Sequence, residues 1–187
     1  MKRKLNFFLL LFLAAFVVSS CNSPSSNSSG AEGGIDQTKL SGQSGVVDEE
    51  SEPNILQVAL GSEDHTTLCA GVVAAGLQDV LTNAGPLTVF APTNAAFDAL
   101  PDGVLDDLLK PENKETLANI ITFHAAPGSY YGNNIKGVMG IGQATGDKVK
   151  VEVKDGVTYV DGAKVLGTVK ASNGYVHVID KVLLPPE

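Results

Sequence analysis

The sequence contains no tryptophan, two cysteines, three histidines and a single arginine, and these scarcities exclude several functions. Two cysteines cannot form a disulfide framework or a four-cysteine metal site. The arginine, Arg3, lies with two lysines at the extreme N-terminus, whereas a nucleic-acid-binding protein usually presents a basic face. The 187 residues include 13 basic and 21 acidic ones, which gives a formal charge of −8. We therefore expect no nucleic-acid partner.

One long apolar run is present, twelve residues from Phe7 to Val18, and three positive charges lie shortly before it at residues 2–4. The run is shorter than the roughly 20 residues that cross a bilayer, so it predicts a secretory signal. Small residues then precede Cys21, a pattern that resembles a bacterial lipobox. The resemblance implies a signal peptide at residues 1–20 and lipidation of Cys21. An ordinary signal peptide followed by a chance cysteine is the alternative.

Residues 22–52 form a polar segment of 31 residues with eight serines, five glycines and six acidic residues. This composition predicts a flexible tether with a reach of about 30 Å. Four acids, Asp48, Glu49, Glu50 and Glu52, gather at its far end. They are either a cation or partner site or a solvated, self-repelling stretch of linker, and we favour the second interpretation.

Lipid on Cys21 would anchor the chain to a membrane without a spanning helix. The next residue is Asn22 rather than aspartate. By resemblance to lipoprotein sorting in enterobacteria, this implies the outer membrane of the bacterial cell envelope. Whether the domain faces the surface or the periplasm stays open.

Apolar positions become periodic from Pro53 to Glu187, and residues 53–187 are predicted to form one α+β domain. Helices are predicted at Asn54–Leu60, Thr66–Ala75, Gln78–Asn83, Gly103–Leu109 and Glu112–Ile121, with a short one after Pro92. Strands are predicted at Leu87–Ala91, Lys148–Val153, Lys164–Lys170 and Tyr175–Leu184, with turns at Asp155-Gly156, Asp161-Gly162 and Asn173-Gly174. Helices early and strands late favour α+β over alternating βαβ units. The glycine-rich stretch from Gly137 to Gly146 is interpreted as a flexible loop.

Three stretches of this domain form recognisable motifs: Leu87–Pro101 (LTVFAPTNAAFDALP), Asn173–Pro185 (NGYVHVIDKVLLP) and the central Phe123–Gly128 (FHAAPG). Together they resemble the fasciclin-like (FAS1) domain family. The resemblance implies a β-wedge of two small sheets packed at an angle, with a cluster of helices from the first half against them. It covers about Pro53–Pro186. One departure is Phe123, which stands where the family usually has tyrosine in a region implicated in integrin binding in animal relatives.

The resemblance and the residue types give two sets of site residues. The structural set, expected to cap, pack or accept hydrogen bonds within the motifs, is Thr93, Asn94, Phe97, His177 and Asp180. The candidate binding set is Phe123, His124, Tyr130 and Tyr131. Adjacent tyrosines in a loop can stack on a sugar or anchor a partner, or they can cover a sheet edge, and both interpretations stay open.

We expect no catalytic residues, no metal site and no cofactor. No serine-hydrolase elbow, zinc-protease motif or phosphate-binding loop is present in the sequence. His124 and His177 could approach one another, but interior histidines with satisfied hydrogen bonds are the favoured interpretation. Cys69, among apolar neighbours, is expected to be a buried, inert thiol rather than a redox sensor.

The favoured function is an envelope-anchored binding or adhesion module that contacts an extracellular protein or glycan, with self-association as a further possibility. The alternative is a carrier of an apolar small molecule such as a carotenoid, because some relatives of the family are associated with carotenoids. An envelope enzyme is the third hypothesis, and the sequence offers it no nucleophile and base.

Overall fold

The computed structural model describes residues 52–83 and 85–186, which fall within one compact unit of the chain. The expected signal peptide, Cys21 and the tether up to residue 51 lie outside the described residues. The α-helices are α1 (Ile55–Leu60), α2 (Thr66–Ala75), α3 (Gln78–Thr82), α4 (Asn94–Asp98), α5 (Val104–Leu108), α6 (Lys114–Phe123) and α7 (Asn133–Lys136), with 3-10 helices η3 (Glu63–His65) and η4 (Pro111–Asn113). The strands are β1 (Leu87–Pro92), β2 (Ala125–Pro127), β3 (Gly140–Gly142), β4 (Lys148–Lys154), β5 (Val157–Val160), β6 (Ala163–Ala171) and β7 (Gly174–Ile179).

Some helix ends coincide with capping groups that the sequence provides. Asn54 caps α1 through a capping box, in which its side chain accepts from Gln57 N and the Gln57 side chain accepts from Asn54 N, both at 2.9 Å. Helix α2 ends at Gly76, whose φ of 75° suits a residue without Cβ. Pro111 opens η4, so α6 begins at Lys114 rather than at the expected Glu112.

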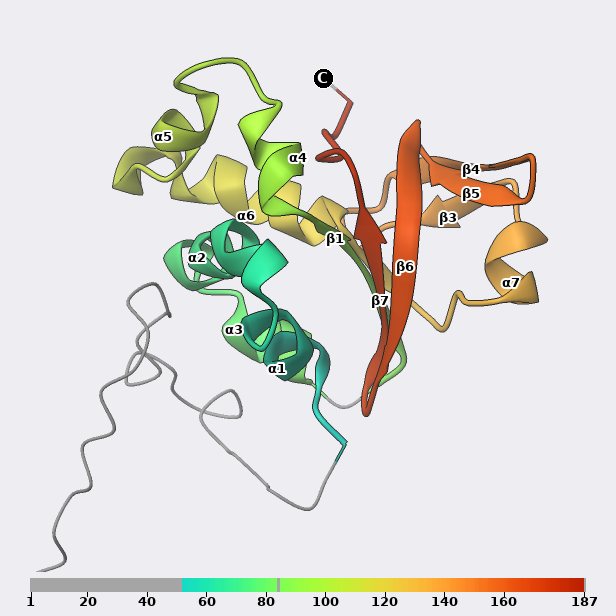
Figure 1. The fold of residues 1–187 in the computed structure, drawn as a ribbon. Coiled ribbons are helices and arrows are strands. Elements are labelled where there is room, and N and C mark those ends of the chain that lie inside the picture. Colours follow the sequence, from blue (N-terminus) through green and yellow to red (C-terminus); the bar gives the residue numbers. More distant parts are fainter. Residues whose placement is uncertain (1–51, 84, 187) are drawn as a thin grey trace, which may run out of the picture. The chain divides into compact units, whose positions relative to one another are not determined.

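The seven strands form one hydrogen-bonded series in the order β2-β1-β7-β6-β5-β4-β3. Strands β1 and β7 pair in parallel, and the other neighbours are antiparallel. Strand β6 joins the two halves, and a register shift between Val165 and Gly167 interrupts its pairing with β7. In Figure 1 the strands β3 to β5 run across the direction of β6 and β7. The α+β wedge is therefore confirmed, with its two angled sheets sharing β6.

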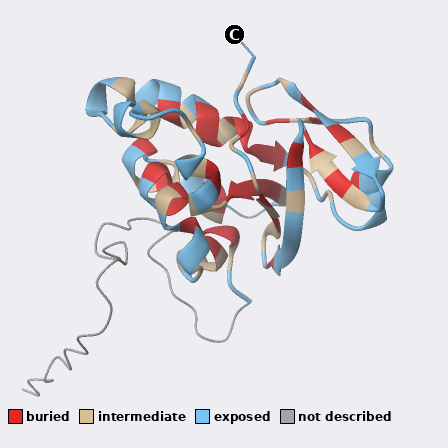
Figure 2. Cartoon of the chain, turned by 45° about the horizontal axis from the view of Figure 1, so that its top comes forward, coloured by how far each residue is buried: buried red, intermediate tan, exposed pale blue. Residues whose placement is uncertain are grey.

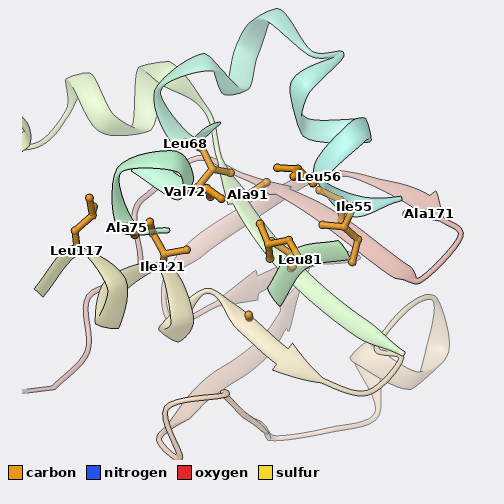
Figure 3. Close-up of a cluster of buried hydrophobic side chains, with 13 residues drawn as sticks. Ile55, Leu56, Leu68, Val72, Ala75, Leu81, Ala91, Leu117, Ile121 and Ala171 are labelled. Carbon is orange, nitrogen blue, oxygen red and sulfur yellow. The ribbon is translucent and has the colours of Figure 1, made fainter. Parts of the chain in front are cut away.

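The β1–β7 pair is the centre of the core because both of its faces are covered. Val89 and Val176 belong to a cluster with the side chains of α1, α2, α3 and α6 (Figure 3). Phe90, the residue after Val89 on β1, belongs to a second cluster with residues of β3, β4 and β5. Figure 2 shows this burial concentrated on the central strands and the helices beside them. A parallel pair covered on both faces explains why every residue of β1 from Thr88 to Pro92 is buried.

The Asp-Gly turns of the second half form as expected. Asp155 and Gly156 have φ of 52° and 80°, and Asp161 and Gly162 have 49° and 78°. Two successive residues with positive φ are typical of the type I′ turns that join twisted strands. These turns connect β4 to β5 and β5 to β6, as the dipeptides predicted.

Two expectations for the second half are wrong. The glycine-rich stretch is not simply a flexible loop, because it contains β3, and Ile141 in that strand is 0% exposed. Its buried side chain holds the stretch against the second core cluster. The last strand ends at Ile179 rather than at Leu184, because Asp180 turns its side chain to Lys164 and pairing stops.

Candidate functional site

Thr93 and Asn94 cap two different helices. The Thr93 hydroxyl accepts from Ala96 N at 3.3 Å and so caps α4. The Asn94 side chain reaches the start of α2, accepting from Thr67 N at 3.0 Å and donating to Glu63 O at 2.9 Å. A first-turn N–H of α2 is thus satisfied by a residue 27 positions away. This long-range cap fixes α2 against α4.

Asn173 and Asp180 make the structural contacts expected of the second motif. Asn173 accepts from Ile55 N at 3.0 Å and donates to Leu81 O at 2.8 Å, so its amide joins α1 to α3. Asp180 accepts from Lys164 N at 2.7 Å. Gly174 follows Asn173 with φ of 156°, and a Cβ there would overlap the backbone of Leu87.

Phe123 and His124, two of the expected binding residues, lie in the interior at 1% and 2% exposed. His124 Nδ1 donates to Ile120 O at 2.8 Å, and its Nε2 accepts from Leu183 N at 2.9 Å. The neutral ring therefore closes the end of α6 and holds the C-terminal segment. These side chains are not at the surface, so a surface site has to be built from other residues.

His177 is also a buried, fully bonded ring, as expected. Its Nε2 donates to Tyr130 O at 2.6 Å, so Nδ1 accepts from the Thr168 hydroxyl at 2.8 Å. The ring stacks on Phe90 with centroids 5.6 Å apart. Burial lowers the pKa of His177, which keeps the ring neutral.

Cys69 is a buried thiol, 2% exposed, and burial raises its pKa to about 11. A thiol with such a pKa is almost entirely protonated at neutral pH, and the protonated form is a poor nucleophile. The expected burial of Cys69 is confirmed. Phe97 likewise packs, partly buried, against the helical core cluster.

The two adjacent tyrosines have different surroundings. Tyr130 is half-buried, packs against the second core cluster, and uses its backbone to bond Thr88 and His177. Tyr131 is 46% exposed and stacks on Tyr175, with centroids 4.2 Å apart and planes 12° apart. Desolvation and the neighbouring Tyr131 raise the pKa of Tyr175. The exposed Tyr131 and the half-buried Tyr175 thus form a stacked pair, which we call the tyrosine pair.

A polar hollow lies beside the tyrosine pair. Its volume is about 580 Å³, and its lining includes Tyr175, Lys170, Ser129, Ser172 and Asn54. Lys170 forms an ion pair with Glu52 at 3.0 Å, and this pair raises the pKa of Lys170. Hydroxyl, amide and ammonium groups next to a stacked aromatic pair form a surface that suits polar ligands with an apolar face.

Sequence reasoning placed Tyr131 in a candidate site but missed Tyr175 and Lys170. The signal that could have found them is the Asn173-Gly174 turn. A hairpin closed there brings Lys170 opposite Tyr175, which is the register observed between β6 and β7. The stacking with Tyr131 could not be derived, because the loop before α7 has no periodic pattern.

An apolar cavity lies among α2, α4, α5 and α6, lined by leucines and isoleucines and by Phe97. Its volume is about 20 Å³, close to that of a single water-sized probe. A carotenoid would not fit without rearrangement of these helices. The carrier hypothesis gains no support from this cavity.

Residues 52–83 and 85–186 contain neither a candidate metal site nor a candidate membrane-spanning helix. No three histidine, cysteine or acidic side chains lie together as metal ligands would. No helix in that part of the chain is both long and apolar enough to cross a membrane.

Comparisons with known proteins identify relatives for most of this domain. Residues 63–185 match the Fasciclin domain family. The chain is similar to Protein sll1483 of Synechocystis, 45% identical over 138 residues that cover 73% of this chain and 76% of that protein. It is also similar to the cell surface glycolipoprotein MPB83 of Mycobacterium bovis, 37% identical over 110 residues, 59% of this chain and 48% of MPB83.

The fold resembles a solved FAS1 domain pair from the insect cell adhesion molecule fasciclin I. The TM-score is 0.63 at 18% sequence identity, covering 71% of this chain and 51% of the domain pair. The chain therefore spans about half of the fasciclin I pair and half of MPB83.

Proposed function

Because the chain belongs to the fasciclin (FAS1) domain family, we propose that it is a binding module of the cell envelope that uses the tyrosine pair to contact an extracellular protein or glycan. The observation that carries the proposal is the exposed Tyr131 stacked on the half-buried Tyr175, beside a polar hollow of about 580 Å³. Aromatic rings provide large apolar contact area at low entropic cost, and they are frequent in binding hot spots.

The anchoring half of the proposal rests on the N-terminus and on one relative. The lipobox-like sequence before Cys21 would attach lipid there, and the polar residues 22–52 would hold the domain away from the membrane. MPB83, which is 37% identical, is named a cell surface glycolipoprotein. Fasciclin I, which shares the fold, is a cell adhesion molecule. These two relatives support placement at the envelope and a binding role.

Attachment of the full chain to cells and matrix of its source organism tests the binding half. Beads coated with the chain are expected to attach, and Tyr131→Ala is expected to weaken attachment about tenfold or more, because a truncated hot-spot aromatic typically costs that much. Bead retention under flow measures the effect.

Tyr159→Ala is the matched control, since Tyr159 is a partly exposed tyrosine on β5, away from the tyrosine pair and next to Lys154. Circular dichroism checks that both variants fold. Equal attachment by wild type and a folded Tyr131→Ala variant would contradict the proposed site.

A further inference from the structure

Strand β6 has one edge that is largely unpaired within the described residues. Strand β5 pairs with it only at Tyr159–Lys164 and Val160–Ala163. From Val165 to Ala171 the recorded partner of β6 is β7, on its other side. Strands β5 and β6 therefore separate after their first two pairs, and the β6 edge lies open beside them.

The antiparallel ladder identifies which backbone groups this edge presents. Lys164 O accepts from Asp180 N, so residue 164 bonds toward the β7 side. Along an antiparallel ladder, residue pairs that exchange backbone hydrogen bonds alternate with pairs that do not. The register shift between Val165 and Gly167 interrupts this alternation, and it starts again at Gly167. Between Gly167 and Ala171, every second residue of β6 therefore directs its N–H and C=O away from β7, toward the open edge. Such a row of free groups is a template for one more strand.

A groove runs along this edge. Its volume is about 430 Å³, and Lys164 to Thr168 of β6 line one side while Gly156 to Thr158 and Lys136 line the other. A second hollow of about 300 Å³, lined by Ile135, Val165 and His177, adjoins it and shares Lys136 and Thr168. Leu166 at the groove is 53% exposed. The groove thus has room for a backbone and apolar surface for alternate side chains.

The charge of the groove is opposite to that of the chain. The lining residues described here include Lys136 and Lys164 but no aspartate or glutamate. Within the described part of the chain neither lysine belongs to an ion pair. Residues 53–130 hold nine acids and two lysines, whereas residues 131–186 hold seven lysines and five acids. The basic charge of an acidic protein is gathered on the half that carries the free edge.

We propose that the free edge of β6 binds an extended segment of a partner protein that alternates apolar and acidic residues, as an added strand in the groove beside Lys136 and Lys164. Main-chain hydrogen bonds to the edge would supply affinity, and the apolar hollow and the two lysines would select the sequence. Tyr131 of the tyrosine pair also lines the second hollow, but Lys136 and the β6 residues Lys164 to Thr168 are not part of the site proposed above. The proposal therefore goes beyond that function.

The test uses the full chain in detergent and a labelled peptide, Glu-Val-Glu-Val-Glu-Val-Glu, in fluorescence anisotropy and hydrogen exchange. The peptide is expected to bind and to slow amide exchange within Val165–Ala171. Lys136→Glu/Lys164→Glu is expected to weaken binding about tenfold, from two lost charge pairs. Lys148→Glu/Lys181→Glu, two exposed lysines outside the groove lining with the same charge change, is expected to bind as wild type.

Peptide chemistry separates strand addition from simple charge attraction without altering the protein. N-methylation of alternate peptide amides blocks one edge of the peptide, so one of the two complementary methylated peptides is expected to bind and the other to fail. Three results would overturn the proposal. The two methylated peptides could bind equally, a peptide with lysine in place of each glutamate could bind as well as the acidic peptide, or the acidic peptide could fail to bind. Dimerisation of the chain with protection of β6 in the absence of peptide would also overturn it, because a second copy would then occupy the edge.

Discussion

At the scale of single residues, the two buried histidines of the family motifs make hydrogen bonds that only one protonation state allows. His124 is the clearest case, since Nδ1 must donate to Ile120 O while Nε2 must accept from Leu183 N. A second proton on the ring would set Nε2–H against the Leu183 N–H. Burial together with this arrangement explains why the pKa of His124 falls to about 4.

The lowered pKa predicts that acid destabilises the fold. The unfolded chain binds a proton near pH 6.5 and the folded chain only near pH 4, so stability is full above 6.5 and falls as the pH drops through that window. The loss from this residue is roughly 3 kcal/mol at pH 4, the free energy of a shift of this size. Urea unfolding at pH 7 and pH 4 measures it.

His124→Gln is the matched variant, because glutamine offers one donor and one acceptor but does not titrate. Its stability is expected to change less between pH 7 and pH 4 than that of wild type. His65 and His177, whose pKa values are also lowered mainly by burial, remain in both proteins and contribute equally. An unchanged pH dependence in His124→Gln would contradict the assignment.

The residue scale also marks a limit of sequence reasoning. The sequence correctly assigned hydrogen-bonding roles to Thr93 and Asp180, because short polar side chains next to helix starts and turns have few other uses. For Asn94 it predicted a cap of the helix that follows, whereas the side chain caps the earlier helix α2. The sequence allowed two roles for His124, a binding residue or an interior histidine, and its side chain is buried in the interior. Burial of one side chain depends on which elements pack over it, and a local pattern does not carry that information.

At the scale of elements, those with strong local signals were predicted and the shortest ones were not. Helix α2 has the predicted bounds, and Asn54 and Gly76 cap helices as expected. Strands β2 and β3 have three residues each, and α7 has four. Elements of this length have too few residues to show a period. They form because β1 and β4 offer partners and because Ala126, Ile135 and Ile141 become buried.

The long-range cap of α2 leads to a prediction at this scale. Asn94→Ala removes the acceptor for Thr67 N and the donor to Glu63 O, so it is expected to cost about 1–2 kcal/mol, the usual value of a lost cap. Thermal or urea unfolding measures the loss. Asn134→Ala is the control, since Asn134 is an exposed residue of α7. A cost for Asn94→Ala no larger than that for Asn134→Ala would show that the cap does not stabilise α2.

At the scale of the whole molecule, the sequence predicted the fold class from the order of its patterns, and the wedge only through the family resemblance. Periodicity gave helices first and strands later, but it could not order the strands. The parallel β1–β7 pair joins Leu87–Pro92 to Gly174–Ile179, which are separated by most of the domain. The two signature motifs are these strands with their flanking residues, so the resemblance identified the long-range contact that local patterns could not.

We propose that this domain is displayed on the outer face of the cell, held there by a lipid anchor at Cys21. Protease treatment of intact cells, followed by a blot for the domain, tests it most directly. Residues 22–52 are expected to be cut and to release a fragment close in size to residues 53–187, because exposed Ser- and Gly-rich segments are preferred sites of cleavage. Protection in intact cells, with cleavage only after permeabilisation, would contradict a surface adhesion role.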